Sequence, residues 1–229
     1  NVAGTAGARV TLDGAGWSGV IVNGTLDAHF VDESGAGIGL TTFAGASATI
    51  ADSTITQTLP SDIALQLGGG ATIDRTHITG GGQSEINGGM LTMTDSVIDL
   101  MRDPRGLDVD CTHNDGGGMT LDHVQITGCH CPVHFNSTTM PVTITNSILG
   151  DVAENPIMIA RTTAEIHHNA LLGGGVGVLD IGGSVTANVS GNYWGRDCAA
   201  GPPGPACASA GITGTTDVLT AMPTDVGPR

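Results

Sequence analysis

The chain has 229 residues, of which 39% are hydrophobic but only 3% aromatic, and it contains 37 glycines. Seven basic residues, all arginines, against 22 acidic ones give a net charge of −15, which opposes binding to nucleic acid or to an acidic membrane surface. The sequence has no run of apolar residues long enough for a transmembrane helix, and its composition favours many short, sharply turned strands over helices.

An apolar residue recurs at intervals of 20 to 28 residues, and a second apolar residue follows each one after five positions. The first series is Ile50, Ile73, Met93, Leu121, Ile144, Ile166 and Val189. The second series is Ile55, Ile78, Ile98, Ile126, Leu149, Leu171 and Trp194. Leu12 and Trp17 continue the same offset near the N-terminus. Such a pattern predicts a solenoid in which each turn buries its apolar side against the next.

Pairs of apolar residues, with one residue between them, precede most members of the first series. The pairs are Ile63 and Leu65, Leu107 and Val109, Val133 and Phe135, Ile157 and Ile159, and Leu179 and Ile181. A period of two is that of a strand, so we expect each coil to hold at least two strands with these residues pointing inward. Gly-rich segments such as LGGGATI and DGGGMTL would form the tight corners.

These patterns predict an all-β fold, a parallel β-helix of about eight or nine coils with about 23 residues in each. We expect residues 1–195 to form the coils and residues 196–229 to form a C-terminal capping coil and tail. Leucine-rich repeats have a similar period, but they need leucines at fixed short spacings and an asparagine ladder, which we do not find in the sequence.

The segments TMTDSVI, TITNSIL and EIHHNALL, followed by VSGNYWG, resemble the repeats of the pectate-lyase-like superfamily. The resemblance covers roughly residues 8–220 and implies a single-stranded, right-handed β-helix from a secreted, periplasmic or cell-surface protein. It also implies a preference for polysaccharides, but it carries no specific activity because the matching segments are structural repeats.

The cysteines divide into two groups. Cys198 and Cys207 flank the Gly- and Pro-rich loop DCAAGPPGPAC, and we expect a disulfide between them, as exported proteins often contain. Cys111 and Cys131 fall in the inward register, so we expect them to fill the core. They would also lie too far apart to share one ion with the nearby histidines, and we therefore predict no metal site.

The outward positions of the first strand in successive coils form two columns that are polar in the middle. Their polar members are Glu85, Asn87, Asp108, Asp110, His134 and Asn136. Paired carboxylates beside a histidine suit acid–base catalysis, so Asp108, Asp110 and His134 are the candidate catalytic groups. The other three are candidate substrate-binding residues. The alternative interpretation is an ordinary solvated strand face.

Two further residues are candidates for the same site. Arg105 lies in the segment MRDPRGLDVD, within the longest interval of the repeat. The resemblance to the superfamily implies an arginine or a lysine as the base of a β-elimination, and because the chain has no lysine, Arg105 is the candidate. A salt bridge from Arg105 to Asp103 or Asp108 is the alternative interpretation. Asp122, on the outward side of the second strand, is a candidate substrate-binding residue.

Three functions agree with these patterns. The first is a protein that binds a polysaccharide or acts on it as a lyase or hydrolase, with Ca²⁺ or a local cluster of arginines needed if the polymer is anionic. The second is a non-catalytic cell-surface structural or adhesion module, whose first coil a neighbouring N-terminal domain or an oligomer would cover. The third is periplasmic copper handling, which rests on the Met and His content and on similarity to copper-maturation β-helices.

Overall fold

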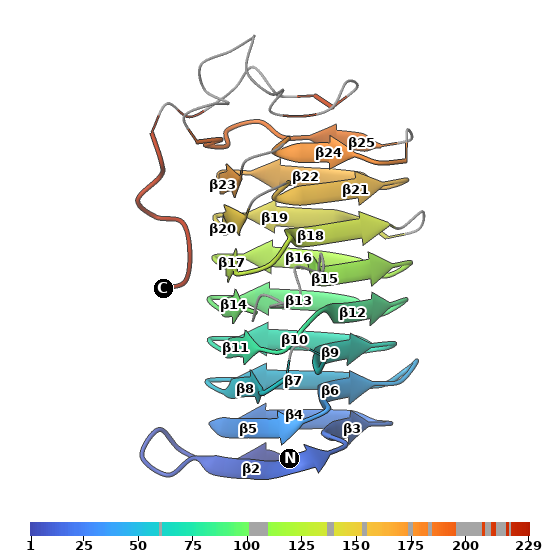
Figure 1. The fold of residues 1–229 in the computed structure, drawn as a ribbon, viewed down its shortest axis with the longest axis vertical. Coiled ribbons are helices and arrows are strands. Elements are labelled where there is room, and N and C mark those ends of the chain that lie inside the picture. The colour runs from blue at the N-terminus through green and yellow to red at the C-terminus, as the bar shows by residue number, and fades with distance from the viewer. Residues whose placement is uncertain are drawn as a thin grey trace.

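The computed structural model describes residues 1–59, 61–100, 110–136, 140–152, 155–173, 176–182, 185–195, 208, 212–213, 219 and 221–229. These residues form an all-β parallel solenoid, in which three sheets run along the length of the molecule (Figure 1). We name them sheets I, II and III. Within the described part of the chain, no helix is long and apolar enough to span a membrane.

The strands of each sheet follow one another at every third position in the chain. Sheet I contains β1 (Val2–Ala3), β4 (Thr25–His29), β7 (Ser47–Ala51), β10 (Gly70–Asp74), β13 (Met90–Thr94), β16 (Gly118–Asp122), β19 (Val142–Thr145), β22 (Thr163–His167) and β25 (Thr186–Asn188). Sheet II contains β2 (Val10–Trp17), β5 (Val31–Ala36), β8 (Thr54–Gln57), β11 (His77–Gly80), β14 (Val97–Asp99), β17 (Gln125–Thr127), β20 (Ile148–Val152) and β23 (Ala170–Gly173). Sheet III contains β3 (Val20–Val22), β6 (Ile38–Thr42), β9 (Ile63–Leu67), β12 (Ser84–Asn87), β15 (Asp110–Asp115), β18 (Cys131–Asn136), β21 (Ile157–Ala160) and β24 (Val178–Asp180).

Each turn of the solenoid supplies one strand to each sheet. Counted over the described residues, β3 to β23 make about seven complete turns of about 22 residues, with partial turns at both ends. This length agrees with the predicted repeat, and three strands per turn agree with the expectation of at least two. Every strand pair is parallel, so the backbone groups of each turn are paired by the turns on either side. The right hand of the coil stays a prediction.

The two predicted apolar series are confirmed as stacked columns in the core. In sheet I the first series pairs residue by residue, with Met93, for example, between Ile73 and Leu121. The second series stacks in the same way in sheet II, where Ile98 lies between Ile78 and Ile126. Each of these six side chains is fully buried. The repeat therefore works as predicted: one apolar residue per strand per turn builds a continuous core.

The N-terminal turns differ from the prediction. Leu12 does not belong to the sheet I column but lies in sheet II, where it pairs with Glu33, which in turn pairs with Ile55. The sheet I column is continued by Ala28, which pairs with Ile50. Ala28 and Glu33 keep the five-residue offset, but a small residue and a charged one do not stand out as apolar anchors. The turn that they belong to was therefore missed from the sequence.

The corner between sheets I and II has one conformation throughout the solenoid. In sheet I, the residue two positions after each member of the core column from Ala28 to Ile166 has a positive φ, near 50°. These residues are Phe30, Asp52, Arg75, Asp95, His123, Asn146 and His168. Five of the seven are Asp, Asn or His, the non-glycine types that most readily adopt this backbone conformation. None is β-branched, which a left-handed corner would disfavour.

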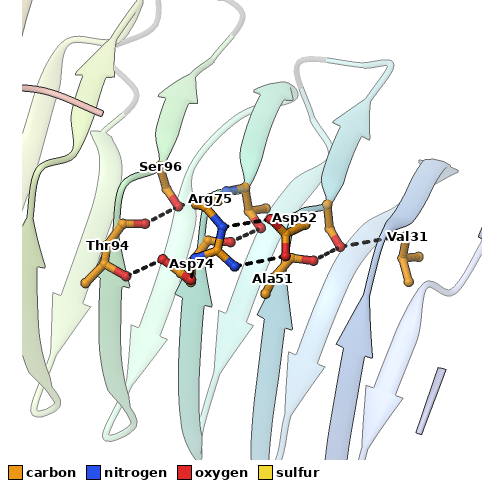
Figure 2. Close-up of polar contacts among 9 residues, drawn as sticks. Val31, Ala51, Asp52, Asp74, Arg75, Thr94 and Ser96 are labelled. Carbon is orange, nitrogen blue, oxygen red and sulfur yellow. Dashed lines mark hydrogen bonds and ion pairs between the residues drawn. The ribbon is translucent and has the colours of Figure 1, made fainter. Parts of the chain in front are cut away.

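A buried hydrogen-bond ladder follows this corner. The Ser53 hydroxyl accepts a bond from the Val31 amide and donates to the Ala51 carbonyl, and Ser96 bonds to Thr76 and Thr94 in the same way (Figure 2). Further along the ladder are Ser147, Asn169 and Asn192. The last two form a short asparagine ladder, a feature that the sequence analysis did not find. The ladder satisfies amides that the bend withdraws from the sheets.

The described part of the C-terminal segment lies against the last turns (Figure 1). Ala208 pairs with Val178 and Thr213 with Asn188, so the chain continues to add backbone bonds after β25. Near the end, the Gly227 amide donates to the Asn146 carbonyl. The predicted disulfide partners Cys198 and Cys207 lie outside the described residues.

Candidate functional site

Polar residues occupy the inward positions of β15, so the register of this strand differs from the predicted one. Thr112 and Asn114 pair with Val133 and Phe135, and both are fully buried. The apolar pair Leu107 and Val109 is predicted at these two positions, so the predicted register of this strand is wrong by five residues. The outward positions of β15 are therefore His113 and Asp115, and not Asp108 and Asp110 as predicted.

Asp110 nevertheless lies in contact with His134. It is the first residue of β15, its side chain is mostly buried, and its Oδ2 atom is 2.7 Å from Nδ1 of His134 on the neighbouring strand. The same oxygen is 3.2 Å from Nδ1 of His113, and Oδ1 is 3.7 Å from Nδ1 of His130. We call Asp110, His113, His130 and His134 the histidine cluster. It brings three imidazoles to one carboxylate.

The in-register pairing of two parallel strands produces this geometry. His113 of β15 pairs with His134 of β18, so their rings are neighbours in an edge-to-face arrangement, with centroids 4.4 Å apart and planes at 66°. His130 comes from the segment just before β18. All three histidine side chains are partly exposed, between 17% and 27%, whereas Asp110 is exposed by 11%. The cluster is therefore open to solvent on one side and closed beneath.

The electrostatics of the cluster depend on these contacts. Burial alone would raise the pKa of Asp110, but the hydrogen bonds from His113 and His134 outweigh it and lower that pKa to about 2. The hydrogen bond to Asp110 raises the pKa of His113 against the effect of burial, and Asp115, 3.3 Å from its Nε2, acts in the same direction. The cluster therefore holds an ionised carboxylate and favours a cation beside it.

A disulfide that the sequence analysis missed borders the cluster. Cys111 of β15 is bonded to Cys129, with a Cα–Cα distance of 5.5 Å. Cys111 is buried in the core, as predicted, and the structure shows that it is half of a disulfide. Cys131 is buried, and its Sγ atom hydrogen-bonds the Val133 carbonyl. The disulfide ties the residue after Asp110 to the residue before His130.

Predicted substrate-binding residues surround the cluster on sheet III. Glu85 of β12 pairs with His113, and Asn87 pairs with Asp115. Asn136 pairs with Asp115 on the other side and donates a bond of 3.1 Å from Nδ2 to its Oδ1. The structure thus places Glu85, Asn87 and Asn136 on one face, as predicted, but with His113 and Asp115 between them.

Other predicted site residues are not brought together with the cluster. Asp122 lies on sheet I, a different side of the solenoid, where its Oδ1 accepts bonds of 2.7 Å from Thr145 and Asn146. Arg105 and Asp108 lie outside the described residues, so their assignments stay predictions.

His113, His130 and Asp115 are members of the site that the sequence analysis did not select. One signal could have identified them. The segments CTHND and CPVHFN both place a histidine two or three residues after a cysteine, and aligning the two histidines gives the observed register with an offset of 21 residues.

The site's chemistry is that of imidazole and carboxylate groups. It could hydrogen-bond sugar hydroxyls, transfer protons through a histidine oriented by Asp110, or hold a cation. No family model matches the sequence, and no curated protein or solved structure matches it either.

Proposed function

We propose that the protein binds a polysaccharide along the outward face of sheet III. A column of outward side chains supports this proposal: Gln66, Glu85, His113 and His134 lie in register on four neighbouring strands. Adjacent members are separated by about 4.8 Å, the spacing of strands in a sheet. Such a column offers a regular row of hydrogen-bonding groups to a chain of sugar hydroxyls.

A second column beside the first adds amide, carboxylate and guanidinium groups. Asn87, Asp115 and Asn136 are in register, and Arg161 donates to the Asn136 Oδ1 from Nη2 at 2.8 Å. The polar region ends at the next strand, where Met158 pairs with His134. We therefore expect a binding region of limited length, centred on the histidine cluster.

The sequence resemblance to the pectate-lyase-like superfamily supports a carbohydrate as the ligand. The Cys111–Cys129 disulfide supports an oxidising compartment, and hence a secreted, periplasmic or surface location. If the protein also cleaves its ligand, His134 is the group that would transfer a proton, with Asp110 fixing the orientation of its ring.

Binding is tested by affinity electrophoresis of the purified protein against uronate polymers and neutral glycans, in buffer that contains EDTA. We expect retardation by at least one polymer, which is lost in Glu85→Gln and Asn136→Ala but kept in Glu165→Gln, a matched change on sheet I. Absence of binding across a broad panel, or equal loss in all three variants, would contradict the proposal.

Catalysis is tested separately with the polymers that bind. Ultraviolet absorbance would reveal the unsaturated products of a lyase, and reducing ends would reveal hydrolysis. A protein that binds without forming either product is the non-catalytic module of the second hypothesis.

A further inference from the structure

We infer that the histidine cluster is a binding site for one divalent transition-metal ion of the zinc type, with Asp110, His113 and His134 as ligands. His130 lies beside these three residues, with its Nδ1 3.7 Å from Asp110 Oδ1, and a water molecule would complete a four-coordinate shell. This reverses the expectation from the sequence, which considered cysteines and histidines as ligands together and rejected a metal because the cysteines fall in the core.

The donor atoms already lie close to the spacing that a metal requires. One ligand atom each from Asp110, His113 and His134 lies within 4.8 Å of the others, and the Asp110 oxygens are 2.7 to 3.7 Å from the three Nδ1 atoms. Metal bonds of about 2.0–2.2 Å place two donors of a tetrahedral site about 3.4 Å apart. Small side-chain movements would therefore convert the cluster into a coordination shell. Any proton on a coordinating Nδ1 atom would be released when the metal binds.

The surroundings of His113 are those of a metal ligand. Its Nδ1 faces Asp110, while its Nε2 is 3.3 Å from Asp115 Oδ2. A coordinating histidine commonly donates its second ring N–H to a carboxylate, which fixes the ring and strengthens it as a ligand. Asp115 is itself held by Asn136, so this supporting contact is in turn fixed.

The disulfide decides the class of metal. Because Cys111 and Cys129 are bonded to each other, the cluster offers nitrogen and oxygen donors without their thiolates. Imidazole with one carboxylate suits Zn²⁺, Co²⁺, Ni²⁺ or Cu²⁺, whereas Cu⁺ prefers sulfur and Ca²⁺ takes six to eight oxygens. The disulfide also joins the two segments that carry Asp110 and His130, so it positions these donors before the ion arrives.

The proposed metal site does not depend on the proposal that the protein binds a polysaccharide. It does bear on catalysis, however, because a His134 ring that binds a metal through Nδ1 cannot also act as the proton-transfer group. A bound cation on this face would also reduce the repulsion between an anionic polymer and a protein of net charge −15.

The test is calorimetric titration of metal-free, untagged protein with Zn²⁺ in the absence of glycan. We expect one equivalent to bind with a dissociation constant below about 1 µM. His113→Ala and His134→Ala should each weaken binding at least about 100-fold, and Asp115→Asn about 10-fold, as expected for a residue that supports a ligand. Co²⁺ should give the intense visible absorption of a four-coordinate site in the wild type alone.

His167→Ala is the matched control, since His167 is a partly exposed histidine 2.7 Å from a carboxylate, that of Glu165, but lies on sheet I. It should bind Zn²⁺ like the wild type. Thermal melts in EDTA check that each variant folds; if an alanine variant does not, the wild-type titration and Asp115→Asn still decide the question. Absent or sub-stoichiometric binding, unchanged binding in the cluster variants, or equal loss in His167→Ala would overturn the inference.

Discussion

The middle and N-terminal turns share one backbone plan but differ in what fills the sheet II column. In the middle turns the column is an unbroken stack of isoleucines, each fully buried. In the N-terminal turns Glu33 occupies the same position between Leu12 and Ile55 and is 3% exposed. A cavity of about 40 Å³ lies beside it. The strands therefore pair normally even where a carboxyl group replaces an apolar side chain in the core. We expect the N-terminal turns to be less stable than the middle turns for this reason.

The largest expected effect comes from placing a charge in the middle turns. Ile144→Asp should destabilise the protein by at least about 4 kcal/mol, because the carboxylate would be buried without a partner between Leu121 and Ile166. Thr143→Asp, one residue away on the outward side, should change stability little. Thermal melts of the two variants measure the difference. Equal destabilisation would show that the inward and outward assignments are wrong.

The second effect is a pH dependence confined to the N-terminal turns. Burial raises the pKa of Glu33 from about 4.5 to about 7, although a backbone hydrogen bond opposes it and the nearby Asp62 carboxylate adds to it. The unfolded chain therefore loses this proton first, so stability falls as the pH rises from about 4.5 to about 7 and then levels off. The loss amounts to about 3 kcal/mol at 1.36 kcal/mol per pKa unit.

Hydrogen exchange in β3 to β6 at pH 5 and pH 8.5 measures this effect where it arises. Lower protection factors, which correct for the base-catalysed rise of the intrinsic exchange rate, are expected at the higher pH in the wild type, and Glu33→Gln should abolish most of the difference. A similar pH dependence in both proteins would mean that another group is responsible. Among the described residues, the side-chain hydrogen bond to this carboxyl group comes from the Gln57 amide, 3.2 Å from Oε2, so ionisation gains little compensation.

The smallest effect compares the corner ladder at two places. Asn169→Ala removes the acceptor of the Ser147 amide and the donor to the Ile144 carbonyl, both buried, and should cost about 2–3 kcal/mol. Ser53→Ala, in the N-terminal turns, removes the acceptor of the Val31 amide and a donor to the Ala51 carbonyl. This carbonyl keeps the Phe30 amide as a partner, so the change should cost about 1 kcal/mol. Urea denaturation of both variants measures the two losses of unfolding free energy. A larger loss in Ser53→Ala than in Asn169→Ala would contradict the expectation that the N-terminal turns contribute less to stability.

The sequence predicted the sheets I and II columns from Ile50 onward because large apolar residues mark them. It failed where the inward position is polar or small, as at Ala28, Glu33, Thr112 and Asn114. Buried threonine and asparagine fit there because they hydrogen-bond locally: Thr112 donates to the Pro132 carbonyl, and Asn114 accepts from the Gly117 amide. One of these partners lies in the same turn of the chain and the other on the neighbouring coil, and a hydrophobicity pattern reveals neither.

The same limit explains the site. His134 and Asn136 were identified because β18 carries the apolar pair Val133 and Phe135, and Glu85 and Asn87 because they flank Ile86. The register of β15, in contrast, does not follow from its apolar residues. Asp110 was selected for an outward position that it does not occupy. Its contact with His134 depends on its place at the start of β15, beside the segment that the disulfide holds.

The in-register sheet I column has a consequence for how such a chain can evolve. Ten residues separate β14 from β15, yet Met93 and Leu121 pair in the sheet I column as if the turn had normal length. Insertions between sheets II and III therefore leave the next turn's alignment unchanged. The number of residues between strands of these two sheets can differ from turn to turn while the column stays in register, and the longest such interval immediately precedes the strand that supplies Asp110 and His113. The architecture separates a segment free to diversify from a scaffold that must not.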